Sequence, residues 1–322
     1  MTTAIVIDRH GGPDVLTVAD IADPEPGPTD LLVEIAAAGV NFIDTYHRSG
    51  LYEVVLPFVP GLEGAGVVTS VGSDVDGFAV GDRIAWSGAG RCYASQVVVP
   101  VAVALAVPSG VDLELAAAVP LQGMTAHYLA CDAAHLKPGD RCLVHAAAGG
   151  TGRLLVQIAK MRGAEVVATV GSEEKAELAR SAGADHVVNY RDADLVDGVE
   201  ALVGPDAIDV VFDGVGAAAF DDSLQLLRTR GSMVTYGNAS GPVPPVAPLR
   251  LMDKSLWLTR PKLWDYVSGR AELEARAADL FGWILAGEME VRVGLRLPLS
   301  EAAEAHRRLE SRETTGKVLL LP

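Results

Sequence analysis

A block of alternating strand and helix patterns in the second half of the chain limits the possible folds most strongly. Arg141–Ala147, Glu165–Val170 and Ile208–Asp213 are apolar almost throughout, and each precedes a segment with helical spacing of apolar residues. Strands that are apolar on both faces and alternate with amphipathic helices are typical of a parallel sheet covered on both sides. The block therefore predicts a doubly wound α/β domain. Its other predicted elements are the strands His186–Asn189 and Ser232–Tyr236 and the helices Arg153–Arg162, Glu173–Ala182, Asp194–Val203 and Phe220–Thr229.

The residues before this block have a different pattern. Short β-branched segments bounded by Gly, Pro and Asp recur at close spacing, which is typical of a barrel or a sandwich. These predicted strands are Ala4–Ile7, Leu32–Ala37, Gly66–Val71, Arg83–Trp86 and Gln96–Val99. Near the C-terminus, the predicted helices Ala271–Leu285 and Ser300–Leu309 and the strand Lys317–Leu320 are too few for a domain. We expect one β-rich domain from residues 1–120 and 259–322, and an inserted domain from 121–258.

Composition and charge exclude several classes of function. The chain has 26 basic and 42 acidic residues, a net charge of −16, and only 5% aromatic residues. Without a basic stripe or stacking platform, nucleic-acid binding is not expected. The N-terminus reaches the charged residues Asp8 and Arg9 too soon for a signal peptide, and the longest apolar run, Val97–Pro108, is too short to span a bilayer. We expect a cytoplasmic protein without membrane segments.

A glycine-rich turn between the first strand and the first helix of the block is the strongest local motif. It can be aligned as A-x-G-x-x-G, with Ala147, Gly149 and Gly152 where a dinucleotide-binding turn has three glycines. The middle glycine lets the backbone approach a pyrophosphate, and the helix N-terminus offers N–H groups to it. The strand–turn–helix context favours this interpretation over a glycine turn that serves only packing.

The end of the second strand bears on the choice of dinucleotide. NAD sites usually place an acid there to bind the ribose 2′-hydroxyl, and this strand ends without one. Ser172 can cap the next helix, and Lys175, one of six lysines, could pair with a 2′-phosphate, with Tyr190 closing the pocket. We therefore expect NADP. The alternative is that Glu173 or Glu174 binds the ribose of NAD.

Metal ligands at the usual spacing are missing. The three cysteines, Cys92, Cys131 and Cys142, cannot form a four-cysteine zinc lobe, and none pairs with a histidine at ligand spacing. Leu62 stands where a catalytic zinc site would need a histidine. We expect no metal.

Several further motifs follow one another along the chain: His10–Leu16, Gly39–Tyr46, Arg48–Tyr52, His145–Gly150, Thr259–Pro261 and Leu309–Arg312. In this order they resemble one family, the zinc-independent quinone oxidoreductases of the medium-chain dehydrogenase/reductase superfamily, especially the bacterial NADPH:quinone oxidoreductases. Thr151 and Gly214 depart from that family, in which valine is usual at the first position and serine occurs in some members at the second.

The resemblance implies a GroES-like domain, a Rossmann domain, and a cleft between them for nicotinamide and substrate. It places Asn41 where zinc-dependent relatives have a cysteine ligand, so that Asn41 would orient the nicotinamide or a carbonyl oxygen. Tyr46 and Tyr52 would face the substrate. A homodimer is also implied, and Met252–Thr259 could offer a sheet edge for it. Similarity, together with the turn motif, assigns the NADPH site to Thr125, Ala147, Gly149, Gly150, Thr151, Gly171, Ser172, Lys175, Tyr190, Asn238, Arg260 and Lys317.

The absence of metal ligands restricts the chemistry of hydride transfer. Reduction of a simple ketone develops an alkoxide that a metal would normally stabilise as a Lewis acid. A quinone or conjugated enone delocalises that charge itself, so positioning and hydrogen bonds can suffice. We expect NADPH-dependent quinone reduction, with the proton supplied by Tyr46 or solvent. A reductase of α,β-unsaturated carbonyls, such as alkenals or enoyl thioesters, is the alternative. An NADPH-binding sensor or RNA-binding protein is a remote one.

Overall fold

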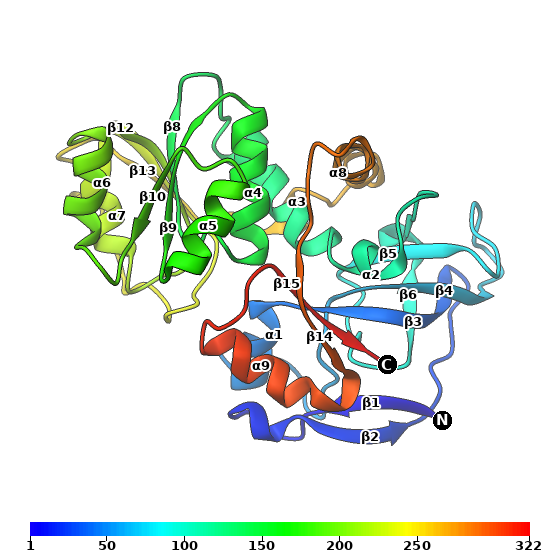
Figure 1. Cartoon of the computed structure of the whole chain (residues 1–322). Coiled ribbons are helices and arrows are strands. Elements are labelled where there is room, and N and C mark those ends of the chain that lie inside the picture. Colours follow the sequence, from blue (N-terminus) through cyan, green and yellow to red (C-terminus); the bar gives the residue numbers. More distant parts are fainter. The chain divides into compact units, whose positions relative to one another are not determined.

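The computed structural model describes residues 1–322, which form two compact units. Unit 1 comprises Met1–Leu121 and Gly269–Pro322, and unit 2 comprises Gln122–Ser268 (Figure 1). The second boundary lies at residue 269 and not at 259 as expected from the sequence. The physical reason is that β13 (Trp257–Thr259) pairs with β12 (Leu227–Thr235), which keeps this segment in the sheet of unit 2.

Unit 1 is built on a mixed seven-stranded sheet with the order β14-β15-β3-β4-β5-β7, in which β6 also pairs with β3. The C-terminal strand β15 lies antiparallel to β3, so residues from both ends of the chain complete one sheet. A separate hairpin joins β1 and β2. The strands are β1 (Thr2–Val6), β2 (Thr17–Ile21), β3 (Asp30–Val40), β4 (Glu63–Val71), β5 (Arg83–Ser87), β6 (Gln96–Pro100), β7 (Leu105–Ala106), β14 (Val293–Pro298) and β15 (Lys317–Leu321), and the helices are α1 (Phe42–Ser49), α2 (Leu113–Ala117), α8 (Arg270–Ala286) and α9 (Ala302–Glu310).

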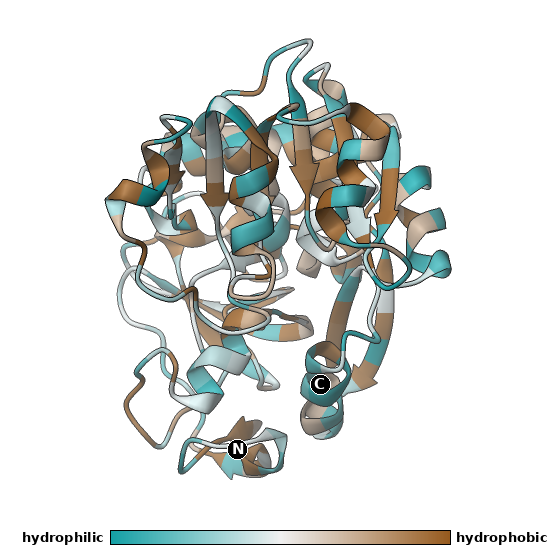
Figure 2. Cartoon of the chain, turned by 90° about the vertical axis from the view of Figure 1, so that its left-hand side faces the viewer, coloured by the Kyte–Doolittle hydropathy of each residue, from teal (hydrophilic) through white to brown (hydrophobic).

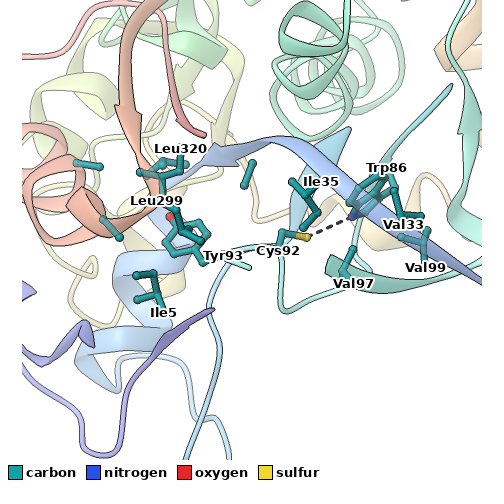
Figure 3. Close-up of a cluster of buried hydrophobic side chains, with 14 of the residues drawn as sticks. Ile5, Val33, Ile35, Trp86, Cys92, Tyr93, Val97, Val99, Leu299 and Leu320 are labelled. Carbon is teal, nitrogen blue, oxygen red and sulfur yellow. Dashed lines mark hydrogen bonds between the residues drawn. The ribbon is translucent and has the colours of Figure 1, made fainter. Parts of the chain in front are cut away.

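The core of unit 1 contains large aromatic side chains as well as aliphatic ones (Figure 3). Trp86 is fully buried, and its indole Nε1–H donates a hydrogen bond to the Sγ of Cys92 at 3.2 Å. Tyr93 is also fully buried, so its hydroxyl needs a partner inside the protein. Burial of these rings ties the segment after β5 to the sheet.

Unit 2 is a six-stranded parallel sheet with the order β10-β9-β8-β11-β12-β13. In Figure 2 its strands are mainly brown, whereas its helices alternate between brown and teal, as a sheet covered by amphipathic helices requires. The strands not yet given are β8 (Arg141–Val144), β9 (Glu165–Val170), β10 (His186–Asn189) and β11 (Ile208–Asp213), and the helices are α4 (Gly150–Met161), α5 (Glu173–Ser181), α6 (Leu195–Val203) and α7 (Phe220–Leu226), while α3 (Pro120–Tyr128) crosses the junction between units.

The predicted helix Phe220–Thr229 is wrong in its last turn. Helix α7 ends at Leu226, because Leu227 already pairs with Ile208 of β11 and begins β12. Helix α1, which the sequence patterns did not predict, begins with a capping box in which Asn41 is the N-cap residue and Asp44 the third helical residue. No helix of the chain has the length and apolarity needed to cross a membrane.

Candidate functional site

The glycine turn of unit 2 joins β8 to the N-terminus of α4. Ala146 takes a left-handed conformation with φ 51°, and Gly149 is the N-cap residue of α4. Because no side chain caps this helix, its first-turn N–H groups can bind an external anion. The turn therefore has the geometry of a phosphate-binding site.

A side chain at either of two glycines of the turn would meet close neighbours, which are backbone at Gly152 and a movable side chain at Gly150. A Cβ at Gly152 would overlap the carbonyl oxygen of Ala146, and one at Gly150 would overlap the carboxamide of Gln122. Gln122 lies on α3, one turn before the predicted residue Thr125, which is 8% exposed. Sequence reasoning missed Gln122, because its approach to Gly150 depends on how α3 packs.

The C-terminal ends of β9 and β10 bring four predicted residues together. Ser172 is the N-cap residue of α5, and its Oγ accepts a hydrogen bond from the backbone N–H of Lys175 at 3.3 Å. The hydroxyl of Tyr190 lies only 2.5 Å from the position that a Cβ at Gly171 would occupy, so a side chain at Gly171 would require Tyr190 to move. The alternative ribose ligand Glu173 is ion-paired with Arg180 at 2.7 Å on the outer surface of α5.

Arg260 and Asn238 meet beyond the ends of β12 and β13. The guanidinium of Arg260 donates to Thr235 Oγ1 at 3.0 Å and to the carbonyl of Gly237 at 2.9 Å. The amide of Asn238, in the orientation that satisfies its neighbours, accepts from Arg260 at 3.1 Å. These contacts place both residues at the same edge of the sheet as the glycine turn, where ligands of doubly wound folds bind.

The predicted substrate residues of unit 1 lie on and next to α1. Tyr46 is 8% exposed and Tyr52 is 37% exposed, and their rings form an edge contact with centroids 5.2 Å apart. The ring of Phe42 lies 6.3 Å from that of Tyr46. Aromatic edges and faces of this kind suit a planar, conjugated ligand.

Asn41 is held by a buried ion pair. Its Nδ2 donates to Glu63 Oε2 at 2.9 Å and to the carbonyl of Gly39 at 3.2 Å, while its Oδ1 accepts from Lys317 Nζ at 2.9 Å. Lys317 also forms an ion pair with Glu63, and both side chains are almost completely buried. Lys317 lies in unit 1, where it contacts Asn41 and Glu63. A side chain at Gly39 would displace this pair.

Glu63 is a residue of this candidate site that the sequence analysis did not select. Its second oxygen, Oε1, accepts from the backbone N–H of Leu121 at 2.7 Å, so both carboxylate oxygens have donors. An acid between the glycines of Gly61–Gly66 was a visible signal, since a carboxylate in a buried strand requires a cationic partner. The partner could not be identified because it lies on β15, at the opposite end of the chain.

The donor set around Asn41 does not suit a zinc ion. A zinc site requires several Cys, His or carboxylate ligands, and no group of three or more such side chains in the chain is arranged to hold a metal. Here a lysine ammonium occupies the place beside Asn41 and Glu63. A second cation next to that ammonium would be repelled.

Comparisons with known proteins agree with this architecture. Residues 27–141 match the family model described as an alcohol dehydrogenase GroES-like domain, and residues 150–281 match the one described as a zinc-binding dehydrogenase. Together these matches confirm the predicted fold class, a GroES-like domain with a Rossmann-type parallel sheet.

Several known proteins are similar to this chain over almost its whole length. The quinone oxidoreductase of Pseudomonas aeruginosa is 42% identical over 325 residues, covering 100% of both chains. A 2-haloacrylate reductase of a Burkholderia species is 39% identical, covering 100% of this chain and 99% of its own. The crystal structure of Escherichia coli quinone oxidoreductase in complex with NADPH superimposes with a TM-score of 0.97 at 41% identity, covering 99% of this chain and 100% of that one.

Proposed function

This chain belongs to the quinone oxidoreductases of the medium-chain dehydrogenase/reductase superfamily, and from that premise we propose that it reduces quinones with NADPH by direct hydride transfer without a metal. The observation that carries the proposal is the buried Lys317–Glu63 pair beside Asn41, the position at which the family resemblance implies a cysteine ligand in zinc-dependent relatives. The words "zinc-binding" describe the family model, and the residues of this chain do not provide such a site.

NADPH fits the residues of unit 2. The uncapped N-terminus of α4 would bind the pyrophosphate, and the pocket of Gly171, Ser172, Lys175 and Tyr190 would bind the 2′-phosphate. When bound, NADPH supplies a hydride at the C4 position of its nicotinamide. Thr125, Asn238 and Arg260 would complete the same site, together with the remaining residues of the turn, Ala147, Gly149, Gly150 and Thr151.

The acceptor must stabilise its own negative charge. A quinone oxygen that receives charge during hydride transfer becomes a delocalised phenolate, which hydrogen bonds alone can stabilise. We assign the orientation of the quinone to the aromatic pair Tyr46 and Tyr52. Asn41, whose side chain is held by Gly39, Glu63 and Lys317 and which is the N-cap residue of α1, would help to position this helix and its aromatic residues.

A second candidate function is the reduction of α,β-unsaturated carbonyls, and the haloacrylate reductase relative favours it. Steady-state NADPH oxidation with a naphthoquinone, an alkenal and an enoyl thioester separates the two functions. We expect the highest kcat/KM for the quinone. A higher kcat/KM for either enone would establish the second candidate, and no turnover with any quinone would refute the first.

Replacing Lys175 by alanine tests the assignment of the cofactor. We expect Lys175→Ala to weaken NADPH binding by about 1.5–3 kcal/mol, the strength of a charge-assisted contact, and to leave NADH binding nearly unchanged. Titration calorimetry with both nucleotides measures this. Arg180→Ala is the matched control, because it removes a cation from the outer face of the same helix. An equal loss of both nucleotides in Lys175→Ala would show that Lys175 does not contact the 2′-phosphate.

We also propose a homodimer that forms through the edge of the sheet of unit 2. Strand β13 is the last strand in the sheet order, and Trp257 on it is 71% exposed. Light scattering at micromolar concentration should give the mass of a dimer, and Trp257→Arg should shift it toward a monomer. Leu202→Arg, which changes an exposed apolar residue on α6, should not. A monomeric wild-type protein would contradict the proposal.

A further inference from the structure

A buried histidine stands directly before the glycine turn of unit 2. His145 follows the last residue of β8 and precedes Ala146, the residue with the left-handed backbone. Its side chain is 2% exposed, and burial lowers the pKa of the imidazole to about 4, so the ring is neutral at ordinary pH. The ring can therefore contribute through hydrogen bonds but not through charge.

Both nitrogens of this ring have a partner. The Nδ1 of His145 lies 2.9 Å from Thr169 Oγ1 on β9, and its Nε2 lies 2.8 Å from Ser223 Oγ on α7. Thr169 and Ser223 are almost completely buried as well. The ring thus joins the residue before the turn to a neighbouring strand and to a helix that packs against the sheet.

The direction of these hydrogen bonds follows from Ser223. Its hydroxyl donates to the carbonyl oxygen of Ala219 at 2.5 Å, so its oxygen is left to accept from the Nε2–H of His145. A neutral imidazole carries one N–H, so Nδ1 accepts from the Thr169 hydroxyl. Each group has a single role, and the ring is held in one tautomer and one orientation.

His145 and Thr169 are polar residues on an apolar face of the sheet. Side chains two residues apart on a strand point to the same face, so His145 lies on the face of Leu143 and Thr169 on that of Val167. Leu143 and Val167 belong to an apolar cluster that also contains side chains of α6 and α7. Leucine and valine would extend this cluster without any hydrogen bond to satisfy. What the polar pair adds is a directional contact next to the turn.

The strand end and the turn are held to different degrees. Thr169 pairs with Val188 of β10 on one side, and its carbonyl accepts the N–H of Ala147 at 3.2 Å on the other. The turn itself is closed by an internal hydrogen bond, from the N–H of Gly149 to the carbonyl of Ala146 at 2.9 Å. The end of β9 is thus paired on both sides, whereas the turn is tied to it by the backbone bond from Ala147.

We propose that His145 is a positioning residue for the pyrophosphate turn: with Thr169 and Ser223 it fixes the start of the turn against the end of β9. This inference rests on the proposed function, because it takes the turn as the pyrophosphate site and the pocket after β9 as the 2′-phosphate site of NADPH. The two sites must keep a fixed separation for one nucleotide to occupy both. Without the imidazole each site still exists, but one nucleotide no longer fits both equally well.

A pair of variants separates positioning from a purely structural role. His145→Phe keeps a ring but removes both hydrogen bonds, and it leaves the buried Thr169 hydroxyl without its acceptor. It should lower both the midpoint of urea unfolding and the affinity for NADPH. His145→Phe/Thr169→Val replaces both polar groups by apolar ones, so the unfolding midpoint should return toward the wild-type value. The affinity should not return, because the directional contact is still missing.

Calorimetric titration of the full chain measures the affinities. Both variants should bind NADPH about tenfold more weakly, as for the loss of one hydrogen bond between the turn and the pyrophosphate. Binding of 2′-AMP, which has the 2′-phosphate but no pyrophosphate, should not change, because the end of β9 keeps its pairing with β10. His186→Phe is the matched control: His186 is hydrogen-bonded to Glu165 at 2.9 Å at the opposite end of the same sheet, so NADPH binding should stay unchanged.

Three results would overturn the proposal. The first is an affinity for NADPH that recovers together with the unfolding midpoint in the double variant, since this would show a purely structural role. The second is an equal loss of NADPH and 2′-AMP binding in His145→Phe. The third is wild-type NADPH affinity in the double variant, which also carries the test if His145→Phe does not fold.

Hydrogen exchange of the free protein gives a readout that needs neither nucleotide nor quinone. In the double variant the amide of Ala147, which donates to the carbonyl of Thr169, should lose protection, while the amide of Leu143 within β8 should keep it. Unchanged protection of Ala147 would refute the positioning role. If the wild-type protein reduces no quinone, the proposed function fails, and the binding and exchange experiments still decide this inference.

Discussion

Replacing Lys317 by methionine should lower the free energy of unfolding by about 3–5 kcal/mol, because it leaves the buried carboxylate of Glu63 without its cation. The surrounding packing cannot compensate, since both side chains are almost completely excluded from solvent. Urea unfolding followed by circular dichroism measures the loss. The double variant Glu63→Gln/Lys317→Met leaves no unpaired charge. It should therefore recover a large part of the free energy of unfolding that Lys317→Met loses.

Lys262→Met provides the control for the loss of a lysine. Lys262 is paired with Asp265 at 3.2 Å, but both side chains are more than half exposed. A surface pair of this kind is worth about 0–1 kcal/mol, so the control should unfold nearly as the wild type does. If Lys317→Met lost no more stability than Lys262→Met, the buried pair would not be the centre of the site that we describe.

A second large effect is expected for Gly152→Ala, which should reduce NADPH affinity by about 100-fold. The new methyl group would overlap the carbonyl oxygen of Ala146 and force the turn away from the N-terminus of α4. Loss of two charge-assisted backbone hydrogen bonds to phosphate, at about 1.5 kcal/mol each, gives this factor. Fluorescence titration with NADPH measures it, and circular dichroism shows whether the fold is kept.

The matched control for this variant is Gly282→Ala. Gly282 lies inside α8, and a Cβ there would meet nothing within 4 Å. It should leave NADPH binding unchanged and can stabilise the helix slightly, because alanine has the higher helix propensity. Wild-type affinity in a folded Gly152→Ala protein would mean that the turn does not bind the pyrophosphate.

The parallel sheet could be predicted from the sequence because its signals are local. The strands Glu165–Val170, His186–Asn189 and Ile208–Asp213 have the predicted bounds, since each is a short apolar run between turn residues. The error at Phe220–Thr229 arose where a helix passes directly into a strand without a turn residue between them. There the pairing of Leu227 with Ile208, a tertiary contact, decides the structure.

In the candidate site, too, the parts that follow local motifs could be predicted from the sequence, and the parts that depend on distant contacts could not. The glycine turn and the pocket around Ser172 and Tyr190 follow local motifs, and the structure brings their residues together. The polar contacts beneath Asn41 could not be predicted, because they join residues 276 and 254 positions apart in the chain. Periodicity and spacing carry no information about such pairs. The pairing of Lys317, which the sequence predicts for the cofactor site, with Glu63 is one of these contacts.

The most direct test of the central claim is quinone reduction by the chain after exhaustive treatment with a metal chelator. We predict that the metal content of the purified protein is far below stoichiometric and that the rate of NADPH oxidation with naphthoquinone is the same before and after chelation. A stoichiometric metal that is lost on chelation together with the activity, and restores the activity when added back, would contradict the account.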